Sequence, residues 1–185
     1  DEGTFPQGGQ YGITSFNSNG WTQGSYGLIS NGSMVAWSWK AGGAPTATNT
    51  QSSGAMTANS VSLDGVLQSA YTPSGSPSVY PNKMTIGTKQ GFSIVQWEMG
   101  GSQTETISHG LSGIPSFYII KNVDATDNYV TYSTNIDGSL DYVFNYGTAG
   151  FTNSARAFPT TSKVEFSSNS AGTHIMYCWH DVPGL

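Results

Sequence analysis

Near the end of the chain runs Ala171-Gly-Thr-His-Ile-Met-Tyr-Cys-Trp-His-Asp181, the stretch that says most about the fold. It is rich in β-branched and aromatic residues and follows the turn residues Asn169-Ser170. Such a run predicts a β-strand over His174–Trp179. Tyr177 and Trp179 stand two positions apart, so they should point to the same face of that strand.

Further runs of this kind predict strands along most of the chain, while stretches with helical periodicity and useful length are missing. Turn residues such as Gly100-Gly101 and Asp137-Gly138 separate several of them at short, regular intervals. This rhythm is typical of a sandwich or a barrel rather than a parallel α/β sheet. The other predicted strands are Met34–Trp39, Phe92–Trp97, Glu105–Ser108, Ser116–Lys121, Tyr129–Ser133, Leu140–Asn145 and Val164–Ser167.

The closing strand has a counterpart near the start of the chain. Asn31–Ala41 aligns without a gap with Ala171–Asp181, which predicts two equivalent parts of successive units in a repeat array. In such an array the paired aromatics should fill the core or the joint between units. The matched positions are Gly32 with Gly172, Ser33 with Thr173, Val35 with Ile175, Trp37 with Tyr177, and Trp39 with Trp179.

The repeat suggests three parts. Residues 1–43 are predicted to be the C-terminal part of a preceding unit, and residues 89–185 a whole unit, so the chain is expected to be a piece of a longer protein. Residues 44–88 are predicted to be a linker rich in Ser, Thr, Gly and Pro, with an edge hairpin around Asp64-Gly65. The fold class expected is all-β: an antiparallel, jelly-roll-like β-sandwich with part of the preceding unit packed at its N-terminal side.

Composition excludes several classes of protein. Only 9% of the 185 residues are charged and the net charge is -5, which disfavours a nucleic-acid groove. Aromatics reach 12%, unlike a disordered chain, and a single Cys excludes an internal disulfide. No apolar run approaches the roughly 20 residues of a membrane helix. The N-terminus lacks the basic start and apolar core of a signal peptide.

Several strings, in this order along the chain, resemble the repeated β-rich domains of tail and tail-fibre-like proteins of tailed bacteriophages. The resemblance implies a non-enzymatic structural component of a virion that presents loops for host attachment, with other copies of itself and other virion proteins as partners. The symmetry usual in fibres suggests a homotrimer. The strings are Val35-Ala-Trp-Ser-Trp-Lys-Ala-Gly-Gly43, Tyr71-Thr-Pro-Ser-Gly-Ser-Pro77, Gly91-Phe-Ser-Ile-Val95, His109-Gly-Leu-Ser-Gly-Ile-Pro115, Ile119-Ile-Lys-Asn122 and Tyr177-Cys-Trp-His-Asp-Val-Pro-Gly184.

Residues able to carry chemistry favour structural roles. His109 precedes a Gly-Ile-Pro turn, where ring nitrogens usually bond nearby backbone, and His174 and His180 stand too far apart along a strand to share a metal. The acids of Asp124–Asp127 and Asp137–Asp141 lack the alternation of a calcium loop and should accept hydrogen bonds from turn N–H groups. We therefore predict no catalytic residue, metal or cofactor, and Cys178 as a small packed side chain.

Four aromatics in polar loops leave two readings open: Trp21, Tyr26, Tyr71 and Tyr80. They either pack on their own loops or stack on sugar rings of host surface polysaccharide. The second reading keeps a carbohydrate-binding module or lectin as an alternative function. A capsid surface fibre or decoration protein is a further alternative, and a polysaccharide depolymerase is the least favoured.

Overall fold

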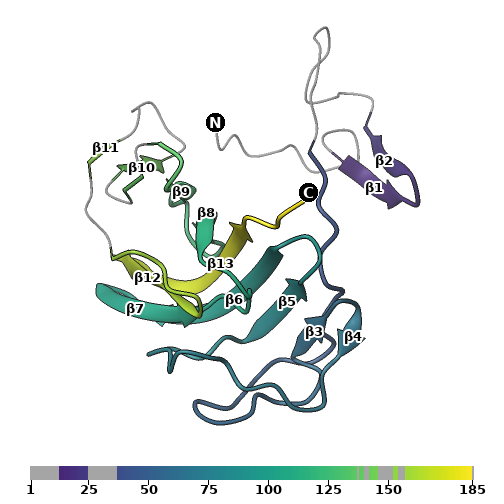
Figure 1. The fold of residues 1–185 in the computed structure, drawn as a ribbon, viewed down its shortest axis with the longest axis horizontal. Coiled ribbons are helices and arrows are strands. Elements are labelled where there is room, and N and C mark those ends of the chain that lie inside the picture. Colours follow the sequence, from purple (N-terminus) through teal and green to yellow (C-terminus); the bar gives the residue numbers. More distant parts are fainter. Residues whose placement is uncertain are drawn as a thin grey trace, which may run out of the picture. The chain divides into compact units, whose positions relative to one another are not determined.

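A computed structural model describes residues 13–24, 37–136, 138–139, 142–145, 152–153 and 157–184. The chain divides into two compact units, residues 1–38 and 39–185. In the part described, every regular element is a β-strand (Figure 1). The first unit contains an antiparallel hairpin, β1 (Ile13–Asn17) and β2 (Gly20–Gln23), in which Phe16 lies opposite Trp21.

The second unit is built on a sheet of nine strands in the order β11-β10-β9-β8-β13-β6-β5-β3-β4. Its pairs are antiparallel except β3–β5, which is parallel, so the sheet is mixed. The antiparallel pair β12–β7 forms a separate sheet. The bounds are β3 Val61–Leu63, β4 Val66–Leu67, β5 Lys83–Gly87, β6 Phe92–Gly100, β7 Gln103–Ser108, β8 Pro115–Asn122, β9 Val130–Ser133, β10 Tyr142–Asn145, β11 Thr152–Asn153, β12 Lys163–Ser168 and β13 Ala171–His180.

The core lies between the large sheet and the β12–β7 pair, which makes the fold sandwich-like, as the sequence predicts. Alternate residues of β6 and β13 are buried, because successive side chains of a strand point to opposite faces. Met176 of β13 lies between Val95 and Ile120 in the register, and all three belong to the buried cluster. β7 and β12 contribute Ile107, Val164 and Phe166 to the same cluster. Burying each such side chain contributes about 1.5–3 kcal/mol.

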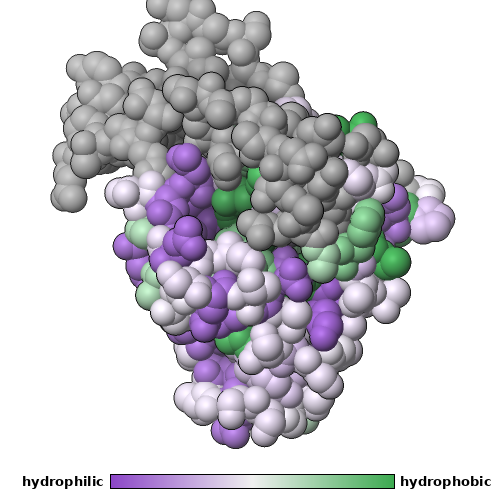
Figure 2. Space-filling model, turned by 90° about the vertical axis from the view of Figure 1, so that its left-hand side faces the viewer, coloured by the Kyte–Doolittle hydropathy of each residue, from purple (hydrophilic) through white to green (hydrophobic). Residues whose placement is uncertain are grey.

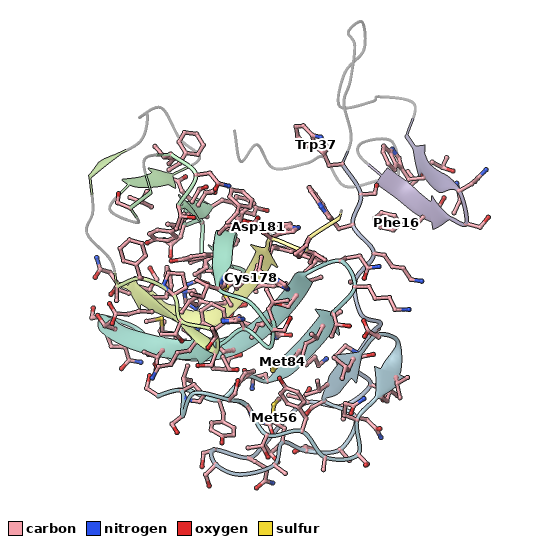
Figure 3. The ribbon with its side chains drawn as sticks, viewed as in Figure 1. Phe16, Trp37, Met56, Met84, Cys178 and Asp181 are labelled. Atoms are coloured by element: carbon pink, nitrogen blue, oxygen red, sulfur yellow. The ribbon has the colours of Figure 1, made fainter. Side chains whose placement is uncertain are left out.

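The long segment before β3 also contributes to this core. Met56, 3% exposed, comes from the segment before β3 and belongs to one cluster with Met84 of β5. Figure 3 shows these two side chains near each other, with Cys178 farther along the sheet on β13. The segment before β3 is therefore part of the packed unit.

All but one of the strands predicted from the sequence are present, as β6 to β10, β12 and β13, with slightly different ends. The exception is Met34–Trp39: residues 34–36 lie outside the described part, and residues 37–39 are not in a strand. Strand β5 was not predicted, because its five residues directly follow a proline-rich loop. The hairpin predicted around Asp64-Gly65 is present as β3–β4. Its turn residues both have positive φ, 49° and 88°, as tight hairpin turns require.

Candidate functional site

Residues 39–49, which we call the entry strap, begin the second unit and lie against its sheet. The Gly42 carbonyl accepts hydrogen bonds from Ser62 Oγ and from the Gly65 N–H, each at 2.7 Å. Thr85 Oγ1 donates to the Gly43 carbonyl at 2.8 Å. A Cβ at Gly42 would stand 1.9 Å from the Ile86 carbonyl oxygen, so only glycine permits this approach. The middle of the strap is thus held by its backbone carbonyls.

Asn49 ends the strap and is 5% exposed. Its Nδ2 donates to the carbonyls of Gln51 and Pro81, both at 2.9 Å. Its Oδ1 accepts from the N–H groups of Gln51 and Thr57, at 3.0 and 2.9 Å. One amide side chain therefore closes the local loop to Gln51 and Thr57 and also bonds the distant Pro81 carbonyl, a buried contact.

Trp39 begins the strap within a group of four rings, Trp39, Phe92, Phe117 and Trp179, which we call the junction cluster. Trp179 of β13 stacks on Phe92 with ring centroids 4.7 Å apart, and Phe117 lies 5.2 Å from it on the other side. Trp39 meets Trp179 edge-on at 5.1 Å and keeps 51% of its surface exposed. Such aromatic pairs contribute about 0.5–1.5 kcal/mol beyond their buried area.

The residues predicted to mark the repeat have different surroundings. Gly32 lies outside the described residues, and Trp37 is 76% exposed. Tyr177 is half-buried on the face of β13 that points away from the core, and burial raises its pKa. Trp39 and Trp179, predicted to be equivalent, contact each other directly.

Gly172 occupies a position in β13 that favours glycine. Its φ is +124°, and a Cβ there would lie 3.1 Å from Asp124 Oδ2. That carboxylate oxygen accepts the Thr173 N–H at 2.8 Å, which holds the pKa of Asp124 below its usual value. Asp124 thus bonds backbone in the way expected for a turn acid.

Beside this turn is a polar cavity of about 310 Å³, which we call the Asn/Ser pocket. Its walls come from the end of β8, the β8–β9 loop, and the turn between β12 and β13. β13 brings His174 to it, because Asn122 and His174 are partners in the β8–β13 register. The lining residues are Ile120, Asn122, Asp127, Asn128, Val130, Phe166, Ser167, Ser168, Asn169, Ser170 and His174.

His174 is a buried residue of this pocket whose ring is only partly hydrogen-bonded. It is 1% exposed, and its ring stacks on Trp97 at 5.4 Å and lies 5.6 Å from Phe166. Its Nδ1 donates to the Gly172 carbonyl at 2.9 Å, so Nε2 of the neutral ring is an acceptor. Nε2 is buried and has no hydrogen-bond partner among the described residues. Burial lowers the pKa of His174, and a buried acceptor without a donor costs about 1–3 kcal/mol.

The other reactive side chains are engaged in structure. Both ring nitrogens of His109 bond backbone: Nε2 donates to the Thr160 carbonyl and Nδ1 accepts the Leu111 N–H, each at 3.1 Å. Burial lowers the pKa of His109 to about 4. Cys178 is buried, and burial raises the pKa of its thiol. Within the described ranges, no three His, Cys, Asp or Glu side chains are placed to hold a metal ion.

The aromatics predicted to bind ligand are divided between the two units. Tyr71 and Tyr80 are half-buried and pack against the core of the second unit, and burial raises the pKa of Tyr71. The Tyr80 hydroxyl donates to the Gly54 carbonyl at 3.3 Å. Trp21 lies on β2 of the first unit with 36% of its surface exposed. Tyr26 lies outside the described residues.

The fold and these sites define an all-β, sandwich-like module with a docked entry segment. Residues 72–185 match the family described as domain of unknown function DUF7483, and the chain belongs to this family. Comparisons with curated proteins and with solved structures gave no match. The matched region covers β5 to β13, while the entry strap and the β3–β4 hairpin precede it. In the described part of the chain, no helix is long and apolar enough to cross a membrane.

Proposed function

We propose that this chain is a non-enzymatic structural part of a bacteriophage particle, tail fibre or tail-associated, in which modules follow one another along the chain. The observation that carries the proposal is the contact of Trp39 with Trp179. The sequence repeat pairs these two positions as equivalents in successive modules. Both residues lie in the second unit, where the contact ties the segment that begins the unit to its last long strand. We propose that each module of the series repeats this contact at the point where the chain enters it.

The entry strap supports this role. It is fixed by the backbone hydrogen bonds of Gly42 and Gly43 and by the four side-chain bonds of Asn49. A segment held in this way stays fixed to its own module, as a mechanical element needs. A flexible linker of the same composition would leave these groups in water.

The low charge of the chain supports contact with other copies, because the cores of interfaces are depleted in charged residues. On the outer face of the large sheet, Tyr177 lies between Ile94 and Ile119 in the register, and all three are half-buried. We propose that a second copy covers this row in a homotrimer. Sedimentation of the chain over a range of concentrations tests this: a monomer throughout contradicts the trimer.

Attachment to the host is proposed for the polar loops. On the face in Figure 2, the described residues are mostly hydrophilic or intermediate, with hydrophobic residues in small separate groups. Such a surface is suited to hydroxyl-rich ligands rather than to lipid. The alternative function, a capsid surface fibre, would use the same polar surface, with the chain on the capsid instead of the tail.

Electron microscopy of particles that carry a labelled copy of the chain tests the proposal. A gold label bound to a tag on the chain should appear at regular places on the tail. Label at the capsid surface would move the proposal to a capsid fibre. Particles without label, from a lysate in which the tagged chain is present, would contradict the virion assignment.

A further inference from the structure

The Asn/Ser pocket has the size of a site for one sugar ring. Its volume of about 310 Å³ lies at the lower end of the range for small-molecule sites, roughly 300–1,000 Å³. Most of the lining residues carry an amide, a hydroxyl or a carboxylate. A ligand that pairs with them needs several hydroxyl groups on a small frame. The three apolar lining residues, Ile120, Val130 and Phe166, offer a surface for the C–H face of such a ring.

The hydrogen-bonding groups at the pocket are unevenly satisfied. Asn122 is occupied by the Ala171 carbonyl and the Asp124 N–H, and Ser168 bonds Ser170. In contrast, His174 Nε2 is a buried acceptor with no partner in the described part. A hydroxyl that enters the pocket would supply the missing donor. This unpaired atom is an observation independent of the cavity itself.

The charges at the pocket discriminate between classes of sugar. Asp127 is part of the lining, and Asp124 and Glu98 act electrostatically on the His174 ring. The lining residues include no Lys or Arg. A uronic or sialic acid would bring its carboxylate toward Asp127, and the nearby ammonium of Lys121 already donates to the Asn122 and Ala125 carbonyls. Neutral hexoses and N-acetylhexosamines avoid this repulsion.

We infer that the Asn/Ser pocket binds one neutral pyranose unit, with His174 Nε2 and the Asp127 carboxylate accepting hydrogen bonds from its hydroxyl groups. The inference names a ligand for the proposed attachment role. It rests on that proposed function, because the sugar would come from the polysaccharide of the host surface. Binding of a single ring at a half-open polar site should be weak, with a Kd on the order of 1 mM. Repeated modules on a particle would raise the overall avidity.

The test is titration of the isotope-labelled chain by NMR with the methyl glycosides of glucose, galactose, mannose and N-acetylglucosamine, and with methyl glucuronoside. At least one neutral glycoside should shift the signals of residues 127–128, 167–170 and 174. Glucuronoside should bind at least about tenfold more weakly. No shift with any neutral glycoside, or tighter binding of glucuronoside, overturns the inference.

Variants separate the site from general stability. Asp127→Asn and Asn128→Ala change half-exposed or exposed groups of the lining and should weaken binding at least about fivefold. Asp181→Asn makes the same charge change outside the lining and should leave binding unchanged. Equal loss in all three contradicts the assignment. The labelled-particle experiment is independent, since a chain located on the tail that binds no glycoside refutes the sugar site alone.

Discussion

The indole ring of Trp39 packs edge-on against that of Trp179, with the ring centroids 5.1 Å apart. Trp39 is the first residue of the second unit, and Trp179 lies in β13, the last long strand. Their contact therefore joins the two ends of this module. Both residues belong to the second unit, so the contact lies within one module. The other two rings of the junction cluster, Phe92 and Phe117, hold Trp179 in place from the neighbouring strands.

Replacement of Trp39 should destabilise the module. Trp39→Ala removes the ring contacts to Phe92 and Trp179, but half of the indole is already exposed. We expect the free energy of unfolding to fall by about 1–2 kcal/mol, measured by urea denaturation. The matched control is Trp37→Ala, which removes a ring that is 76% exposed and should cost less than about 0.5 kcal/mol. Equal losses would contradict a specific role for Trp39.

Asn49 should be the most sensitive polar residue of the entry strap. Asn49→Ala leaves two carbonyls and two N–H groups without their side-chain partner. We expect a loss of about 2–4 kcal/mol in the free energy of unfolding, because unpaired buried polar groups keep their desolvation cost. Asn135→Ala, at an exposed position, should change it by less than about 0.5 kcal/mol. A strap that folds as well without Asn49 would show that its hydrogen bonds are unimportant.

His109 should make the module sensitive to acid. Its folded pKa of about 4 lies below the ordinary value of 6.5, so the unfolded chain takes up this proton first as the pH falls. The stability contribution is complete above 6.5 and is lost as the pH falls toward 4. Between about pH 7.5 and about pH 5 the loss should be about 2 kcal/mol.

The control for this pH dependence is His109→Gln, which lacks the titrating group. His174 also has a lowered pKa and acts in the same direction, so it contributes to both proteins. The difference in unfolding free energy between about pH 7.5 and about pH 5 should therefore shrink by about 2 kcal/mol in the variant. The same pH dependence in both proteins would show that His109 is not responsible.

Cys178 should be inert in the folded chain. It is buried between strands β6 and β8, and the raised pKa of its thiol keeps it protonated at neutral pH. A thiol reagent such as Ellman's reagent should modify it only in denaturant. Rapid modification of the native chain would show that this strand opens readily.

The sequence predicts the strands of this fold well, since they are runs of β-branched and aromatic residues between turns. Its account of residues 44–88 is less complete. Strand β5 lies within the segment expected to be a linker, and β3 pairs with it in parallel. The entry strap contains few apolar residues, yet two glycine carbonyls fix it to the β3–β4 hairpin and β5, and Asn49 fixes it to the neighbouring loops. Backbone hydrogen bonds of this kind leave no hydrophobic pattern in a sequence.

The Asn/Ser pocket could be predicted only in part. The sequence shows Asn169-Ser170 and the acids of Asp124–Asp127 as polar turn residues between predicted strands. Their proximity depends on the register of β8 against β13, which places Asn122 beside His174. A shift of one residue would turn His174 to the opposite face and remove the pocket's acceptor. Register depends on packing across the sandwich, so the sequence alone did not reveal it.

The proposed incorporation of this module into a phage particle is tested most directly by quantitative mass spectrometry of density-gradient-purified particles. Peptides from residues 39–185 should band with the known particle proteins and remain after a high-salt wash, at a constant ratio between preparations. Peptides found only in the soluble part of the lysate, with none in the particle band, would contradict the account.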